Sequence, residues 1–133
     1  LKDMQKTKQQ LLLRKEDYDI MLAYVRGGTG KQYFDRYNAE ELEGELKKAK
    51  LVDKEKFPAD VVGLNSTVII REEAAKKDME LMLVVPDKAD IKQRRISFLS
   101  PIGTALIGFR KGQCVQWSVP AGMKTFTIVD VKN

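Results

Sequence analysis

The side chains that could carry out chemistry in this sequence are limited in kind. Among 133 residues there is no histidine, and Cys114 is the single cysteine. A histidine base, a catalytic triad and a zinc site of cysteine and histidine therefore cannot be assembled within this chain. Proton transfer would be left to carboxylates, lysine or tyrosine. Because one cysteine cannot form an internal disulfide, we expect a cytoplasmic protein.

The carboxylates that come closest to forming a cluster are Asp35 and the glutamates that follow it, Glu40, Glu41 and Glu43. Paired carboxylates can hold Mg²⁺ or position a water molecule. The simpler interpretation is that the glutamates complement the positive end of a helix that begins here, and we favour it. We expect no metal and no cofactor.

The loop GGTGKQ, residues 27–32, invites comparison with a phosphate-binding P-loop. That motif needs a glycine five positions before Gly30, where this chain has Val25, and a serine or threonine after the lysine, where it has Gln32. A P-loop also follows a strand, whereas a helical pattern leads into this loop. We therefore interpret it as the tip of a helical hairpin.

Basic residues gather in the second half of the chain. The net charge is +5, and residues 61–133, with 11 basic and 7 acidic side chains, carry +4 of it. The stretch 91–129 contains no acid, and such a surface suits an acidic protein partner or nucleic acid, with a solvated face as the open alternative. Because the aromatics stand at expected core positions instead of offering stacking platforms, we favour a protein partner. The basic residues proposed for this surface are Arg94, Arg95, Arg110 and Lys111.

Two amphipathic helices are predicted in the first part of the chain. One covers residues 15–26 and ends at the glycines 27–28; the other covers residues 39–51, with Asn38 as N-cap and Glu41 three positions later. Each is too short to be stable alone, so we expect them to pack as an antiparallel hairpin. The apolar positions of the first helix are Tyr18, Met21, Leu22 and Val25.

The pattern changes after residue 57, where short β-branched or apolar runs bounded by turn residues predict an antiparallel sheet. Before the fourth strand, Ser100 as cap and Pro101 as first helical residue predict one short helix. The fold class is α+β: an N-terminal segment, 1–57, with the hairpin, and a sheet domain, 58–133. The five expected strands cover residues 66–71, 80–85, 95–98, 113–119 and 124–131.

The C-terminal run ISFLSPIGTALIGFRKGQCVQWSVPAGMKTFTIVDV, residues 96–131, resembles the C-terminal domain of the GreA/GreB transcription factors. That family shows a strand, the motif SPI-x-x-ALIG, a charged turn with glycine, a second strand, a Pro-Gly turn and a closing strand. The segment KKAKLVDKEKFPADVVGLNSTVII, residues 47–70, is similar to the family's passage from coiled coil to first strand. Within the family, Gly103, Trp117 and the turn at Val119-Pro120 resemble the Rnk type, the regulator of nucleoside diphosphate kinase.

The resemblance implies an FKBP-like sheet domain that docks at the rim of the secondary channel of bacterial RNA polymerase, and it implies contact with nucleic acid only through that complex. Family members with a long coiled coil place tip carboxylates, which hold Mg²⁺, in the channel and promote RNA cleavage. Helices of about 12 residues span only about 18 Å, and Lys31 and Arg36 flank Asp35 at this tip. We therefore expect a monomeric, non-enzymatic regulator that competes with cleavage factors. The implied docking loop comprises Leu99, Ser100, Pro101, Ile102 and Gly103.

Three alternatives remain open at this point. The protein could stimulate cleavage with Asp35 and Glu40 or Glu41 as metal ligands. The implied FKBP-like fold raises prolyl isomerisation, which needs an aromatic-lined pocket that the scattered aromatics do not promise. The basic residues could instead bind an unrelated acidic partner. With 32% charged residues and no long apolar run, the chain is not expected to span a membrane.

Overall fold

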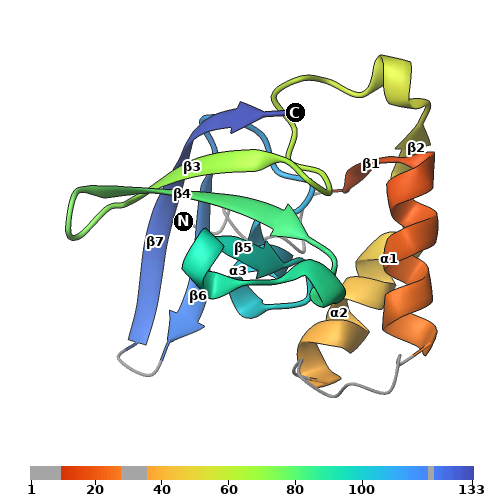
Figure 1. Ribbon diagram of the computed structural model, residues 1–133, viewed down its shortest axis with the longest axis horizontal. Coiled ribbons are helices and arrows are strands. Elements are labelled where there is room, and N and C mark those ends of the chain that lie inside the picture. Colours follow the sequence, from red (N-terminus) through yellow and green to blue (C-terminus); the bar gives the residue numbers. More distant parts are fainter. Residues whose placement is uncertain (1–9, 28–35, 120–121) are drawn as a thin grey trace.

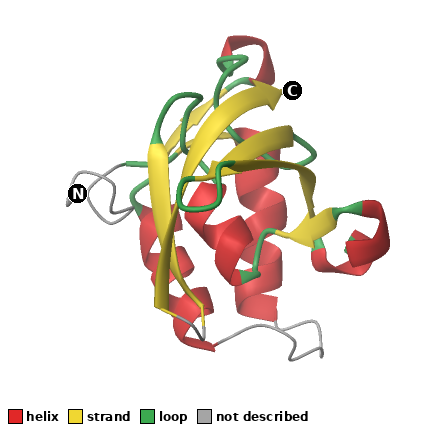
Figure 2. Ribbon diagram, turned by 90° about the vertical axis from the view of Figure 1, so that its left-hand side faces the viewer, coloured by secondary structure: helices red, strands yellow, loops and turns green. Residues whose placement is uncertain are grey.

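The computed structural model describes residues 10–27, 36–119 and 122–133. A pair of helices, α1 (Lys15–Gly27) and α2 (Arg36–Lys47), stands beside a twisted five-stranded sheet (Figure 1). Figure 2 shows most of the helical ribbon gathered below the curved sheet, with short helical turns standing apart from it at the top and at the right. Within these residues, no helix is both long and apolar enough to cross a membrane.

The hairpin forms as the apolar spacing predicts, and its helices differ from the expected ones at their ends. Met21 on α1 and Leu42 and Leu46 on α2 are fully buried. The predicted capping box at Asn38 is wrong, because α2 already begins at Arg36 and Asn38 lies within its first turn. Across the hairpin, the Nε atom of Arg26 lies 3.0 Å from Oε2 of Glu43.

A short parallel strand pair closes the base of the hairpin. Strand β1 (Leu12–Arg14) precedes α1, and strand β2 (Lys50–Val52) follows α2; Leu12 pairs with Lys50. The expected end of the second helix at residue 51 is wrong for this reason, since the backbone N–H of Lys50 donates to the carbonyl of Leu11 (2.8 Å). Backbone hydrogen bonds thus join the segment that enters the hairpin to the segment that leaves it.

All five predicted strands are present in one sheet, in the order β5-β4-β3-β7-β6. The sheet is antiparallel except for β5, which runs parallel to β4. The reason is the connection: after β4 the chain passes through the 3₁₀ turns η4 (Pro86–Lys88) and η5 (Ile91–Gln93) and re-enters the sheet opposite Met82, so that β5 runs in the same direction as the last three residues of β4. The strands are β3 (Thr67–Glu72), β4 (Lys77–Val84), β5 (Arg95–Ser97), β6 (Cys114–Val119) and β7 (Gly122–Lys132).

A β-bulge explains an irregular pattern in the last strand. Phe126, Ile128 and Val131 are all buried although their spacing breaks strict alternation. In the pairing of β3 with β7, Ile69 lies opposite Asp130 and the next residue, Ile70, lies opposite Ile128, so one residue of β7 between them has no partner. The extra residue in β7 reverses the alternation, so apolar side chains on both sides of the bulge reach the same core.

One hydrophobic core joins the hairpin to the sheet. It includes Leu11, directly before β1, and Leu13 within β1, both of which sequence patterning missed, together with Phe98 and Leu106 of the later segment. Leu11 packs so closely on Gly108 that a Cβ there would lie 2.5 Å from the leucine Cδ2 atom. Residues before and after position 57 therefore share one core. The division into segments 1–57 and 58–133 stays a prediction.

A buried ion pair also ties α1 to the segment before β3. Asp17 is 7% exposed, and its Oδ2 atom lies 2.8 Å from Nη1 of Arg14 and accepts a hydrogen bond from the N–H of Leu64 (3.2 Å). The guanidinium of Arg14 stacks 4.2 Å above the ring of Phe57. Burial raises the pKa of Asp17, although Arg14 and the Leu64 N–H act in the opposite direction.

Tyr24 forms a second connection between the hairpin and the sheet. Its ring packs edge-on against Phe98, with the centroids 6.1 Å apart. Partial burial raises the pKa of the Tyr24 phenol, and the carboxylate of Asp87, which accepts its hydrogen bond, raises it further. The hairpin is therefore fixed to the sheet at its base and again near the end of α1.

Candidate functional site

The segment between β5 and α3 (Pro101–Leu106) is held by a serine-based network. The Oγ of Ser97 accepts a hydrogen bond from the N–H of Leu99 (2.9 Å). Ser100 caps α3: its hydroxyl accepts from the N–H of Gly103 (3.0 Å) and donates to the carbonyl of Ser97 (2.8 Å). The predicted cap at Ser100 and first helical residue at Pro101 are both confirmed.

Only part of the predicted docking loop faces outward. Leu99 is 2% exposed and belongs to the core, so its side chain cannot make a docking contact and that assignment is corrected. Gly103 is buried as well, since a Cβ there would lie 2.2 Å from the carbonyl oxygen of Ser97. Pro101 is exposed and Ile102 is half-buried. The loop therefore presents an apolar pair at the start of α3, with Ser100 holding it in place.

The hairpin tip falls largely outside the described residues. Lys31 and Asp35 belong to that part, and Arg36 is described only as the first residue of α2. Glu43 pairs with Arg26 instead of facing a shared site, as noted above. Among the residues that the structure does describe, no group of three cysteine or carboxylate side chains is placed to hold a metal ion.

The predicted basic surface separates into two parts. Arg110 pairs with Asp60 (Nη1 to Oδ1, 3.2 Å), and the Nζ atom of Lys111 lies 3.5 Å from Oδ1 of Asp130. Arg94 and Arg95 are exposed at the start of β5, and no ion pair to either is found in the described part of the chain. The structure therefore does not combine all four residues into one free basic face.

Ile91 is a surface residue that the sequence analysis did not single out. Its side chain is 85% exposed on η5, next to Lys92. The available signal was a lone aliphatic residue in the polar run DKADIKQRR, residues 87–95. An isolated exposed isoleucine is common on protein surfaces, and its position beside unpaired arginines is what sets this one apart.

Two hollows on the described surface are large enough to hold a small ligand. One, of about 420 Å³, lies between β4 and the start of β5; the other, of about 350 Å³, lies between the β3–β4 turn and the start of β7. No aromatic side chain is among the described residues that line either of them. Neither hollow has the aromatic lining that prolyl isomerisation would need.

Comparison with known proteins places this architecture in a family. The family model for the C-terminal part of "Transcription elongation factor, GreA/GreB" matches residues 57–133. Transcription elongation factor GreA of Pelobacter propionicus is 37% identical over 102 residues, which are 77% of this chain and 65% of that protein. GreA of Trichlorobacter lovleyi is 36% identical over the same length.

Solved structures agree with this assignment. The GreA/GreB transcription elongation factor from Nitrosomonas europaea superimposes with a TM-score of 0.78 at 31% identity, covering 94% of this chain and 99% of the other. Gfh1 of Thermus aquaticus has a TM-score of 0.53 at 21% identity, covering 93% and 99%, and shares the fold.

The chain belongs to the GreA/GreB family of transcription elongation factors. The family resemblance read from residues 96–131 is thus confirmed, and so is the α+β fold class. The chain spans 65% of the length of the Pelobacter relative. Membership of the Rnk branch stays a prediction.

Proposed function

We propose that this protein is a cytoplasmic, non-enzymatic regulator that docks on bacterial RNA polymerase at the rim of the secondary channel, competes there with cleavage factors, and does not itself stimulate cleavage. The observation that carries the proposal is the closed base of the hairpin. Helices of 13 and 12 residues between paired strands give an arm of about 18–20 Å.

The length of this arm is set within the chain and does not depend on where the sequence starts. Beyond the paired strands β1 and β2, only the eight residues between α1 and α2 can add to it. We propose that an arm of this length occupies the channel entrance and brings no carboxylate to the reacting RNA. Its basic residues Lys31 and Arg36 support the same role, since metal capture needs acidic ligands.

Docking is assigned to Pro101 and Ile102, with Ser100 as a positioning residue. Apolar side chains at the centre of a contact patch, held in place before binding, lose little entropy when they bind. The serine network at the start of α3 supplies that pre-organisation through hydrogen bonds of 2.8–3.0 Å.

Co-purification with core polymerase tests the docking assignment. Pro101→Glu places a charge on the apolar pair, while an acidic residue at the first position of a helix is favourable for folding. We expect at least tenfold weaker binding by this variant, and unchanged binding by Pro86→Glu, which makes the same change at the start of η4. Equal binding by both variants, or failure of the parent protein to displace a cleavage factor, would refute the proposal.

Cleavage stimulation is the second candidate, and the GreA relatives, which are named elongation factors, favour keeping it. In this case Asp35 and Glu40 or Glu41 would supply the metal ligands. A backtracked polymerase complex separates the two functions. Our proposal expects no shortening of the RNA above background, whereas Mg²⁺-dependent shortening that Asp35→Asn abolishes would establish the alternative. A proline-peptide assay is expected to show no isomerase activity.

A further inference from the structure

The outer edge of β4 is covered by a neighbouring strand along only part of its length. This strand has eight residues, yet β5 pairs only with its last three, from Met82 to Val84. The remaining residues, 77–81, have β3 on one side and no described strand on the other. In Figure 1 the β3–β4 hairpin runs out beyond β5, which leaves this edge open.

The backbone of the open edge is oriented for strand addition. The N–H of Met82 donates to the carbonyl of Arg94 on the outer side (2.9 Å), and the N–H of Leu83 donates inward to Ser66 (3.1 Å). Because backbone groups alternate along a strand, Glu80 and Asp78 direct their N–H and C=O groups outward as Met82 does. No hydrogen bond from the described part of the chain reaches these groups. Unpaired edges of this kind are templates for an added strand.

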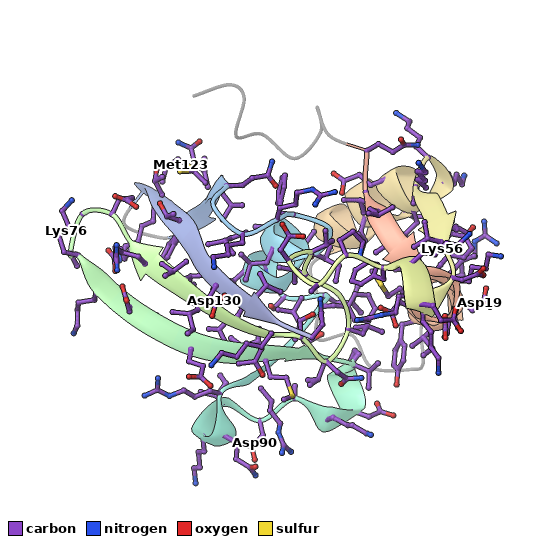
Figure 3. The ribbon with its side chains drawn as sticks, turned by 90° about the horizontal axis from the view of Figure 1, so that it is seen from above. Asp19, Lys56, Lys76, Asp90, Met123 and Asp130 are labelled. Atoms are coloured by element: carbon purple, nitrogen blue, oxygen red, sulfur yellow. The ribbon has the colours of Figure 1, made fainter. Side chains whose placement is uncertain are left out.

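A hollow of about 420 Å³ lies where this open edge meets the start of β5. Arg94 and Arg95 line it on the β5 side, and Glu80 is the one acidic residue among those lining it. The exposed Ile91 and Lys92 stand on η5 beside it. In Figure 3, Asp90 marks η5 beside the outer edge of β4, and Lys76 marks the hairpin turn farther along. The hollow and the free edge therefore form one continuous surface.

The basic side of the hollow is held rigidly. Asp90 accepts hydrogen bonds from the N–H of Lys92 (3.0 Å) and from Nε2 of Gln93 (2.9 Å). The backbones of Asp90 and Arg95 bond to each other twice, at 2.9 and 3.0 Å. Arg94 is fixed at φ = 61° by the turn between these bonds. The backbone that carries Arg94 and Arg95 therefore needs little ordering when a partner binds.

We propose that the open edge of β4 and the adjoining hollow bind an extended, acidic segment of a protein partner. The segment adds as a strand along residues 78–80, its carboxylates face Arg94 and Arg95, and one apolar side chain packs against Ile91. A phosphate backbone fits less well, because it carries no amide N–H and C=O groups with which to extend the sheet along residues 78–80. The proposal does not depend on polymerase being the partner.

The probe is a fluorescein-labelled nine-residue peptide of alternating glutamate and valine, added to the 133-residue protein. We expect saturable binding by anisotropy, and in ¹⁵N-labelled protein the amide signals of Asp78 and Glu80 should shift. The variant Arg94→Glu/Arg95→Glu should weaken binding at least tenfold. Lys54→Glu/Lys56→Glu, an equal charge change on the exposed turn η3 (Lys54–Lys56), should not.

Two further probes test the mode of binding. A peptide N-methylated along one edge keeps its charge but cannot form the ladder, so we expect it to bind at least tenfold more weakly. Single-stranded RNA of nine nucleotides should bind more weakly than the acidic peptide. The proposal is overturned if no saturable binding occurs, if both charge variants lose affinity equally, if N-methylation has no effect, or if RNA binds more tightly.

Discussion

Replacing Gly103 by alanine tests whether close backbone packing positions the docking loop. The added Cβ would lie 2.2 Å from the carbonyl oxygen of Ser97 and 2.9 Å from the Cα of Phe98. Both obstructing atoms are backbone, and the segment that contains them is held by the hydrogen bonds around Ser97 and Ser100. The clash therefore cannot be relieved by rotating a side chain.

The expected cost follows from two opposing effects. Overpacking a tight site costs about 1–3 kcal/mol, and obstruction by backbone places Gly103→Ala at the upper end of that range. Alanine in place of glycine within a helix returns about 1 kcal/mol. We expect the free energy of unfolding to fall by about 2 kcal/mol, which lowers the folded-to-unfolded ratio about 30-fold.

Urea unfolding followed by circular dichroism measures this change. Gly44→Ala is the matched control, because Gly44 is an exposed residue of α2 and a Cβ there meets nothing within 4 Å. The control should gain about 0.5–1 kcal/mol from helix propensity alone. If Gly103→Ala were as stable as the parent protein while Gly44→Ala showed its gain, the backbone around α3 would be yielding and our account of the loop would be wrong.

Two other predictions concern the attachment of the hairpin. Leu13→Ala should lower the free energy of unfolding by about 2–5 kcal/mol in urea, because Leu13 is fully buried in the shared core, whereas Leu12→Ala at the half-buried neighbour should cost less. Burial raises the pKa of Asp17 in the folded protein above its value of about 4 in the unfolded chain, so protonation of this carboxyl stabilises the folded state. The stabilisation is complete below the unfolded pKa and is lost as the pH rises through the folded pKa. Asp17→Asn removes this dependence, so urea unfolding should show the parent protein gaining stability relative to the variant as the pH is lowered from 7 to 4.

The sequence was most informative where a local pattern determines the structure. Helical spacing placed α1 within one residue, and β-branched runs located all five strands of the sheet. The strand pair β1–β2 was missed because it depends on contacts between residues 38 positions apart, for which three leucines in a row give no sign. The same pair explains why the second helix ends early.

The site was predicted less well than the fold. Phe98 and Leu99 are both buried although adjacent strand residues point to opposite faces, because the chain leaves the strand after Ser97 and turns into α3. Pairing of Arg110 with Asp60 joins positions 50 residues apart, so a run of basic residues could not reveal which charges remain free. Resemblance to a family located the loop, and packing decided which of its side chains face outward.

The closed base of the hairpin makes arm length a variable that can change separately from the rest of the molecule. Equal numbers of residues added to the end of α1 and to the start of α2 would lengthen the hairpin at its tip. The pairing of Leu12 with Lys50 and the serine network at the start of α3 would stay as they are. Seven added residues in each helix lengthen the arm by about 10.5 Å and keep the same faces in contact, apart from a drift of about 20°. The same sheet domain can thus carry hairpins of different lengths. One chimaera with a longer hairpin and another with an acidic tip would show separately how hairpin length and tip charge affect the activity of the protein.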